Sequence, residues 1–278
     1  MKPINILHIL ITILLLLTAP ASGAPNTRPA GPDLALLTPA ATLMQMRKKR
    51  TRVFLVDIRP QKEFSAFKIP GSLNIPAALI KTKAFLKTGP VILVHQGVSH
   101  NVPASIARDL NQKSFNASVL QGGLASWQHK GGELVGNPFA LKTLNTISCR
   151  TFFSGMHHED WIVINLSQTP SLQKIIPMAI VPETNKSTPP GSVSLASLPA
   201  LQHLTDTTSI IIADDTGRDY ARIIQQLPAP YRHKAFGLTG GMQAFQNFLT
   251  THMLANRPKT QRTVETGDCD PCKKRQAQ

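Results

Sequence analysis

Short runs of β-branched and apolar residues alternate with helical stretches along this chain, and that alternation constrains its fold more than any other feature. Apolar runs at residues 53–56, 92–94 and 117–120 have the length and composition of buried strands. Residues 34–46 and 102–111 have the spacing of helices. Strands that alternate with helices usually pair in parallel and are covered on both faces. The sequence therefore predicts an α/β fold built on parallel sheets flanked by helices.

The N-terminus has the composition of an export signal. Lys2 precedes an almost wholly apolar run at residues 4–18, and Ala19-Pro-Ala21 offers small residues at a cleavage site. The apolar run is short for a membrane-spanning helix, and an uncleaved membrane anchor is the alternative. We therefore expect a signal peptide at residues 1–24, a lead-in at 25–32, and a mature protein that is periplasmic or secreted.

The chain is strongly basic, with a formal net charge of +15 over its 278 residues. Such a charge favours acidic partners, anionic membranes or nucleic acid. The basic residues are dispersed, however, apart from Arg47-Lys-Lys-Arg50, which is typical of a solvated loop or helix end. Aromatic residues make up only 5% of the chain and offer no stacking platform for bases. We expect no nucleic-acid partner and do not predict membrane association.

Four motifs carry the most specific signal in the first half of the chain. They are Val53-Phe-Leu-Val-Asp57-Ile-Arg59, Ile69-Pro-Gly-Ser-Leu-Asn-Ile-Pro76, Val91-Ile-Leu-Val-His95-Gln-Gly-Val-Ser-His100-Asn, and Val119-Leu-Gln-Gly122-Gly123 with Trp127 downstream. In this order and spacing they resemble the rhodanese domain, a family of sulfurtransferases and their inactive relatives. The resemblance implies a scaffold role for Asp57 and Arg59, which would tie the end of the first strand to nearby loops by charge-assisted hydrogen bonds.

A weaker copy of the same pattern follows. Strand-like runs begin at Trp161 and at Ser209, a loop starts at Asp214, and Gly240-Gly241 repeats the earlier Gly-Gly turn. The polar, basic C-terminus is poor in apolar residues, which is typical of a mobile tail. The predicted organisation is a signal peptide at 1–24, a lead-in at 25–32, a rhodanese-like domain at 33–135, a linker at 136–154, a degenerate rhodanese-like domain at 155–253 and a flexible tail at 254–278.

The loop after the central strand decides what the first domain does. In active members of the family this strand ends in a cysteine that carries sulfur as a persulfide, whereas this sequence has His95. Imidazole forms no comparable persulfide, so the resemblance implies that the domain lacks sulfurtransferase activity. The predicted binding loop consists of His95, Gln96, Gly97, Val98, Ser99, His100 and Asn101.

Three roles are open for His95. It would simply fill the former cysteine position, bind an anion or metal together with His100, or shuttle a proton. In the second domain the corresponding loop begins with Asp214, whose carboxylate would satisfy the loop N–H groups by itself. We expect a structural role for Asp214, and a hydrolase using Asp214 and Asp215 is the alternative. We assign no residue as a metal ligand and predict no cofactor.

Three cysteines complete the set of reactive residues. Cys269 and Cys272 form a Cys-Asp-Pro-Cys motif that would act as a redox pair, close a small structural disulfide or bind a metal transiently. Cys149, placed between the domains, would be buried and inert or would pair with another protein.

These observations predict an exported protein that binds or scaffolds in extracytoplasmic sulfur or redox handling. Its folded domains would not be enzymes, and its partner would be a protein or a thiol outside the cytoplasm. One alternative is a thiol–disulfide or sulfur carrier that works through Cys269 and Cys272. The other is a metal-binding accessory protein that uses His95 and His100.

Overall fold

The computed structural model describes residues 33–182, 195, 198–202 and 204–255. The predicted signal peptide, the lead-in and the Cys-Asp-Pro-Cys motif lie outside the described residues. Within the described part of the chain, no helix is both long and apolar enough to cross a membrane. We call the described residues up to Leu141 the N-terminal half and those from Thr146 onward the C-terminal half.

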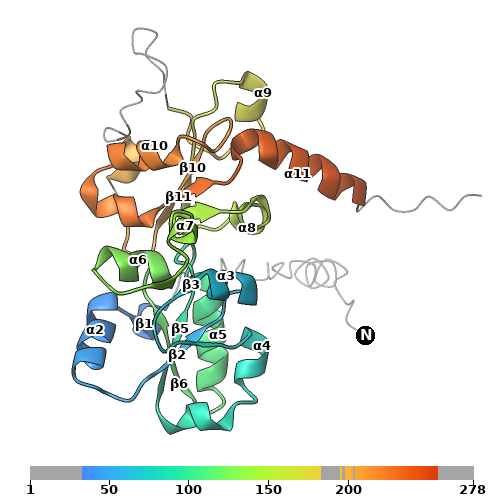
Figure 1. The fold of residues 1–278 in the computed structure, drawn as a ribbon. Coiled ribbons are helices and arrows are strands. Elements are labelled where there is room, and N and C mark those ends of the chain that lie inside the picture. The colour runs from blue at the N-terminus through green and yellow to red at the C-terminus, as the bar shows by residue number, and fades with distance from the viewer. Residues whose placement is uncertain (1–32, 183–194, 196–197, 203, 256–278) are drawn as a thin grey trace, which may run out of the picture.

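Each half is built on a parallel sheet, as predicted (Figure 1). The first has the strand order β1-β6-β5-β2-β4, and the second has the order β8-β11-β10-β9. The first sheet contains β1 (Leu37–Thr38), β2 (Phe54–Asp57), β4 (Leu73–Asn74), β5 (Pro90–Val94) and β6 (Asn116–Leu120). The second contains β8 (Thr146–Ile147), β9 (Trp161–Asn165), β10 (Ser209–Ala213) and β11 (Ala235–Leu238). The two orders correspond strand for strand, and an isolated parallel bridge between Ile164 and Ile180 stands where β4 stands in the first sheet.

Helices cover both faces of the first sheet. They are η1 (Leu34–Leu36), α2 (Ala40–Lys48), α3 (Gln61–Ala66), α4 (Ala77–Ile80), η2 (Ala84–Thr88), α5 (Asn101–Asn111), α6 (Gly123–His129) and α7 (Pro138–Leu141). The central strand β5 shows why both faces are apolar. Its Ile92 and Val94 pack under α2 and α6, whereas Val91 and Leu93 pack under α4 and α5, because successive side chains of a strand point to opposite faces.

The second sheet repeats this arrangement. Its helices are α8 (Cys149–Gly155), α9 (Pro170–Gln173), η4 (Pro199–Leu201), α10 (Tyr220–Gln226), η5 (Ala229–Lys234) and α11 (Gly241–Ala255). Ile211 of β10 packs in the core that α8 and α11 cover, and Ile212 packs in the core that α10 covers. The strand is therefore fully buried, as its continuous apolar run predicts.

The first predicted helix is wrong at its N-terminal end. The spacing predicts a helix throughout residues 34–46, but Leu37–Thr38 form β1, which pairs with Val119 and Leu120 of β6. Pro39 explains the break, because the residue before a proline is driven out of the helical region. The helix α2 accordingly begins only at Ala40.

The predicted linker at 136–154 is also wrong in part. Thr146 and Ile147 pair with Gly237 and Leu238 of β11, so β8 is the edge strand of the second sheet. Phe152 of α8 is fully buried in the core of the C-terminal half. At the other end of the segment, β7 (Val135–Gly136) pairs antiparallel with β3 (Phe67–Lys68) and extends the first half. Strands of two residues carry no periodicity that a sequence could reveal.

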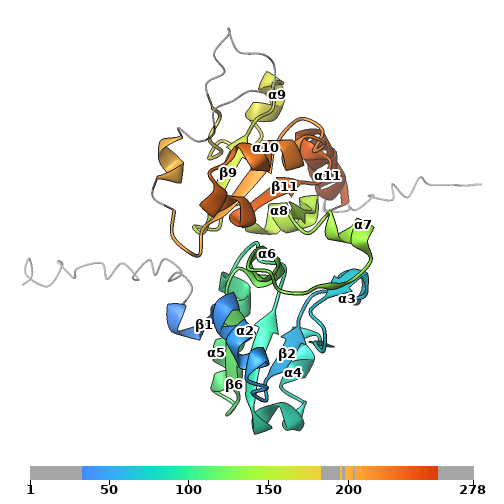
Figure 2. The same ribbon diagram turned by 60° about the vertical axis from the view of Figure 1, so that its left-hand side comes forward.

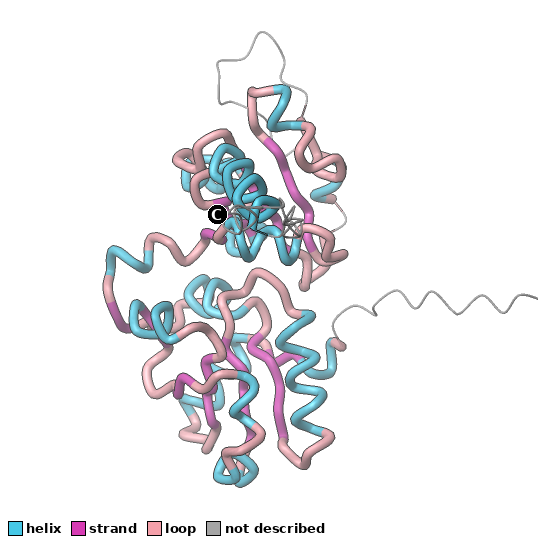
Figure 3. The backbone as a smooth tube through the Cα atoms, turned by 90° about the vertical axis from the view of Figure 1, so that its right-hand side faces the viewer, coloured by secondary structure: helices cyan, strands magenta, loops and turns pink. Residues whose placement is uncertain are grey.

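The two halves are packed against each other. Figures 2 and 3 show them stacked, and Figure 2 places α6 at the junction below α8. Val98 and Ala125 of the N-terminal half belong to the same apolar cluster as Trp161 and Phe236 of the C-terminal half. The loop that follows β5 is therefore covered by the other half.

Candidate functional site

His95 directly follows β5 and is buried, with 6% of its surface exposed. Its Nδ1 accepts a hydrogen bond from the Gly97 N–H at 3.2 Å, and its Nε2 lies 3.1 Å from the Leu120 carbonyl oxygen. Because Nδ1 accepts, Nε2 carries the proton and donates to that carbonyl. Burial, reinforced by the nearby His100, lowers the pKa of His95 to about 3. The side chain is thus a neutral imidazole with both nitrogens occupied.

His100 stands at the far side of the same loop and is also buried. The two rings lie 5.4 Å apart, so the expected closeness of these histidines is confirmed. Nε2 of His100 accepts from the Gly122 N–H at 2.7 Å, and burial lowers the pKa of His100. Among the described residues, no group of three or more His, Cys, Asp or Glu side chains is placed to hold a metal ion. Both nitrogens of His95 are already hydrogen-bonded, so the geometry gives no support to a metal site that uses His95 together with His100.

The loop after β5 is closed by its backbone geometry as well as by the His95 side chain. Gly97 has φ +118°, and a Cβ at this position would collide with the Gly122 carbonyl. The Leu124 and Ala125 N–H groups donate to the His95 and Gln96 carbonyls at 2.9 and 3.2 Å. The loop is therefore clamped against the Gly-Gly turn, and its interior holds the imidazole.

The C-terminal half covers this loop from outside. Ser99 Oγ lies 3.0 Å from Asp160 Oδ2, and Trp161 Nε1 donates to the Val98 carbonyl at 2.8 Å. The Gln96 side-chain amide donates to the Leu144 and Thr146 carbonyls at 2.9 and 2.7 Å. The predicted binding loop is thus a contact between the two halves.

Asp214 begins the corresponding loop of the C-terminal half. Its carboxylate accepts from the Gly217 N–H, and from the Asp219 N–H at 3.2 Å. This is the self-satisfied loop expected from the sequence. Asp215 is engaged elsewhere: it accepts from the Ser167 hydroxyl and from the Gln168 N–H. The two carboxylates hold different segments, which does not favour the paired-carboxylate hydrolase.

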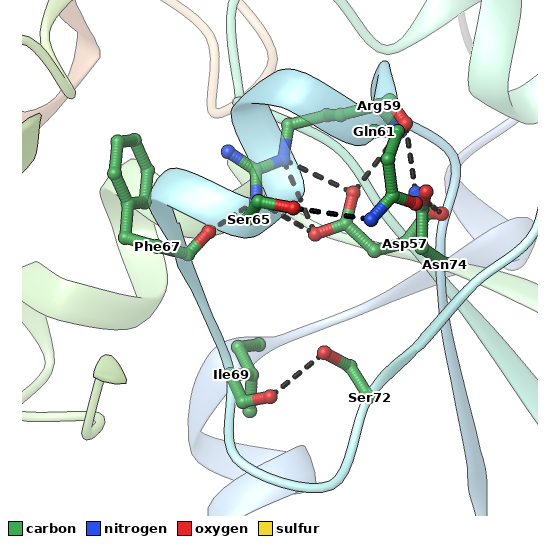
Figure 4. A network of polar contacts seen from close by, with 8 residues as sticks. All are labelled: Asp57, Arg59, Gln61, Ser65, Phe67, Ile69, Ser72 and Asn74. Atoms are coloured by element: carbon green, nitrogen blue, oxygen red, sulfur yellow. Dashed lines mark hydrogen bonds and ion pairs between the residues drawn. The ribbon is translucent and has the colours of Figure 1, made fainter. Parts of the chain in front are cut away.

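Asp57 and Arg59 form a buried polar network (Figure 4), in agreement with the scaffold role that the family resemblance implies. The Arg59 guanidinium donates to both Asp57 carboxylate oxygens, with Nη2–Oδ2 at 2.8 Å, and to the Phe67 carbonyl at 2.7 Å. Asn74 donates to the Asp57 and Arg59 carbonyls at 2.9 and 2.8 Å. The network ties the end of β2 to β3 and β4, as a scaffold role requires.

A cleft of about 430 Å³ lies between the halves, beside the Gly-Gly turn. The His129 and His233 rings stack in it across the junction, 4.4 Å apart and 10° from parallel. Lys130 and Lys234 also line it. Burial first, and then the neighbouring His129 and lysines, lower the pKa of His233 to about 4. The cleft has the size of a small-molecule site. Its lining carries two lysines and two histidines, and also Asp206, whose Oδ1 lies 3.4 Å from Lys234 Nζ.

The contacts of several of these residues could not be predicted from the sequence. Asp160 and Trp161 show only the start of a strand, and His129 and His233 stand far apart in the sequence. Their roles depend on how the two halves stack, and no local pattern encodes that. Cys149, singled out from the sequence, is a half-buried free thiol whose pKa is raised by burial, which makes it a weak nucleophile.

Comparison with known protein families agrees with the motifs of the first half of the chain. A family model described as the rhodanese-like domain matches residues 39–130. Residues 39–130 form a rhodanese-like domain. The match takes in the strand, loop and helix that hold His95, and the core in which Trp127 lies 3% exposed. The side chain of Trp127 therefore packs inside this domain.

Solved structures similar to the chain include the following. A protein from Bacillus halodurans is 27% identical, over 37% of this chain and 78% of that one, with a TM-score of 0.34. A rhodanese-related protein from Thermoplasma volcanium is 23% identical, over 35% and 95%, with a TM-score of 0.30. A thiosulfate sulfurtransferase from Pseudomonas aeruginosa is 18% identical, over 76% and 42%, with a TM-score of 0.32. No curated protein matches the chain.

Proposed function

We propose that this protein is an exported binding or scaffold protein of the sulfurtransferase family that does not itself transfer sulfur. The relation to that family rests on the rhodanese-like domain. The observation that carries the proposal is the state of the loop after β5. Its first residue is a buried imidazole with both nitrogens hydrogen-bonded, and the loop is sealed by the other half. A sulfur carrier needs a thiolate that donor and acceptor molecules can reach.

The second half is, in this proposal, a degenerate copy of the first. Support comes from the corresponding strand orders and from the equivalent loops, in which Gly217 and Gly97 both have positive φ. Asp214 holds the second loop closed without help from outside. The second half then serves to cover the first loop and to build the cleft between them, and the cleft is where a binding function would reside.

The proposed compartment is the periplasm or the exterior, on the strength of the predicted signal at residues 1–24. In that setting the partner is a protein or a thiol. The rival function is a carrier that uses Cys269 and Cys272, both outside the described residues.

A sulfurtransferase assay separates the two functions. We expect the full-length protein and its Cys269→Ser/Cys272→Ser variant to be equally inactive with thiosulfate and cyanide. Activity in the wild type that the double variant loses would overturn the proposal in favour of the carrier. In parallel, a Cys272→Ala trap expressed in the native compartment should accumulate no mixed disulfide through Cys269.

The variant His95→Cys tests whether the C-terminal half closes the loop after β5 to molecules in solution. The introduced thiol would take the place of the imidazole as acceptor for the Gly97 N–H, but Asp160 and Trp161 would still cover the loop. We expect this thiol to resist alkylation in the folded protein and to support no sulfur transfer. The matched control is Ser154→Cys, at an exposed position on α8, which should be alkylated at once. Rapid alkylation of the His95→Cys variant at the substituted position would contradict the sealed loop.

A further inference from the structure

A second hollow, separate from the cleft, lies at the end of α8 and shares Trp161 with the cover over the first loop. It has a volume of about 330 Å³, and its lining includes Met156, His157, His158, Trp161 and Met178. These residues comprise two thioethers, two imidazoles and an indole, with no carboxylate and no thiol in the lining. We infer that this pocket, defined as the Met–His pocket, binds a soft monovalent metal ion of the Cu(I) class.

The backbone fixes the position of the ligands. Met156 caps α8, and the next turn is closed by the His158 N–H donating to the Gly155 carbonyl at 2.8 Å. The Trp161 N–H then donates to the His158 carbonyl and starts β9. Met178 comes from a distant segment, two residues before the Ile180 bridge to the edge of the same sheet. Two chain segments therefore converge on one pocket.

One feature of the pocket lacks a structural explanation. The Nδ1 atom of His158 is buried and has no hydrogen-bond partner among the described residues. A buried ring nitrogen without a partner is costly and is often explained by an ion or a water molecule. Met178, which is 51% exposed, contributes a thioether to the lining of the same pocket. A metal ion held between them would use both the spare nitrogen and the exposed sulfur.

The type of ligand selects the metal. Thioether sulfur is soft and selects Cu(I), and imidazole also suits copper. Zinc sites generally have four N, S or O ligands in a closed tetrahedron, and the pocket offers only two imidazoles of that kind. Among the described residues no group of three His, Cys, Asp or Glu could hold a metal ion, so zinc is disfavoured here as well. Cu(I) and its redox-inert analogue Ag(I) fit the donors present.

Trp161 completes the pocket. Its ring stacks on Phe152 at 6.4 Å, and the His158 ring meets it at 5.7 Å and 67°. An indole face attracts a cation that is shielded from water. The chain contains two tryptophans, Trp127 and Trp161, so the indole N–H signals in a proton–nitrogen NMR spectrum provide a local reporter and an internal control.

The test uses the full-length chain with Cys149, Cys269 and Cys272 replaced by serine, which removes competing thiols. Ag(I) is titrated and followed by calorimetry and by the two indole signals, which a Trp127→Phe variant assigns. We expect one bound ion per chain, a shift of the Trp161 signal and no shift of the Trp127 signal. An equimolar amount of Zn(II) should neither shift the signal nor compete with Ag(I).

Matched substitutions then locate the ligands. Met156→Leu and Met178→Leu keep volume and hydrophobicity, and each should weaken Ag(I) binding by about tenfold or more, since each removes one soft sulfur ligand. Met46→Leu, at a partly buried methionine of the N-terminal half, should leave it unchanged. Because Met178 is exposed, Met178→Leu is not at risk of misfolding. Binding that is as tight in Met178→Leu as in the parent, or a Trp161 signal that does not move, would overturn the inference.

Discussion

The loops after the central strands of the two halves each need an acceptor for a glycine N–H, and they supply it with different side chains. In the N-terminal half an imidazole accepts the Gly97 N–H, and in the C-terminal half a carboxylate accepts the Gly217 N–H. In each half the next helix is clamped in the same way, since Leu124 and Met242 donate to the carbonyls of His95 and Asp214 at 2.9 and 2.8 Å. The two loops share their backbone hydrogen bonds, but they differ in the side chain at the first position.

The loops differ in what covers the residues that follow their first side chain. His95 and Asp214 are both buried, with 6% and 9% of their surface exposed. The rest of the first loop lies under Asp160 and Trp161, whereas residues 216, 218 and 219 of the second are exposed. An imidazole can stay neutral in a dry loop, and burial favours that form. A carboxylate is better tolerated where water and two N–H groups stabilise its charge. The comparison shows how each replacement matches the solvation of its loop, and in both halves the position is filled by the chain itself.

The largest expected effect is on the buried ion pair at the end of β2. Asp57 and Arg59 in the N-terminal half correspond to the neutral Asn165 and Ser167 in the C-terminal half. Arg59→Met leaves the Asp57 carboxylate, which is 0% exposed, without its partner. We expect the free energy of unfolding to fall by about 3–5 kcal/mol, measured by urea denaturation.

The matched change in the other half is Ser167→Ala. It removes a hydrogen bond to the Asp215 carboxylate and one from the Thr169 N–H, and it should cost about 2 kcal/mol. The variant Asp57→Asn/Arg59→Met should recover part of the loss, because it buries no unpaired charge. Equal costs for Arg59→Met and Ser167→Ala would show that the ion pair does not distinguish the halves.

The second effect is a dependence of stability on pH that the imidazole loop imposes. The pKa of His95 is about 3 in the folded protein, against an ordinary value of 6.5. Below pH 6.5 the unfolded chain binds the proton and the folded chain does not, so the stabilisation is complete above that pH and falls toward pH 3. This histidine alone should remove about 2 kcal/mol between about pH 7 and pH 5.

The variant His95→Gln isolates that contribution. Glutamine offers an acceptor and a donor but does not titrate, so the unfolding free energy of this variant should fall less steeply between about pH 7 and pH 5. Some slope should persist, because the pKa values of His100 and His233 are also lowered. Ser154→Ala, at an exposed position that does not titrate, is the control and should leave the slope unchanged. A His95→Gln slope identical to that of the wild type would mean that folding does not lower the pKa of His95.

Much of the fold and part of the site could be predicted from the sequence. Buried parallel strands such as β5 and β10 are marked by continuous apolar runs, and Gly97 and Gly217 mark their loops. The edge strands β1 and β8 could not be found, because two residues show no period. The filling role of His95 was one of three alternatives, and only the partners of its two nitrogens distinguish them.

The cover that the C-terminal half places over the loop after β5 could not be predicted for a different reason. Asp160 contacts Ser99 across 61 positions, and the contact exists only because the halves stack with this loop inside. The same is true of the His129–His233 pair. Local patterns report which elements form, but the way two packed units face each other depends on the fit of whole surfaces.

The smallest expected effect lies in the carboxylate loop and tests whether solvation explains the contrast. Asp214→Ala leaves the Gly217 and Asp219 N–H groups without their acceptor. Asp214 is 9% exposed, but residues 216, 218 and 219 beside it are exposed, so water can reach the two N–H groups once the carboxylate is removed, and the cost should be about 1–2 kcal/mol. Asp214→Asn keeps one acceptor oxygen and should cost less than half as much.

The corresponding truncation in the buried loop should cost more. His95→Ala leaves the Gly97 N–H and the Leu120 carbonyl unpaired and opens a void that the C-terminal half covers. A buried unpaired group pays its full desolvation cost, and the void adds to it. The two alanine variants, compared by urea denaturation at neutral pH, should therefore differ clearly, with the larger loss in His95→Ala. Equal losses would mean that burial of the loop does not set the strength of its hydrogen bonds, and that the cover provided by Asp160 and Trp161 admits water.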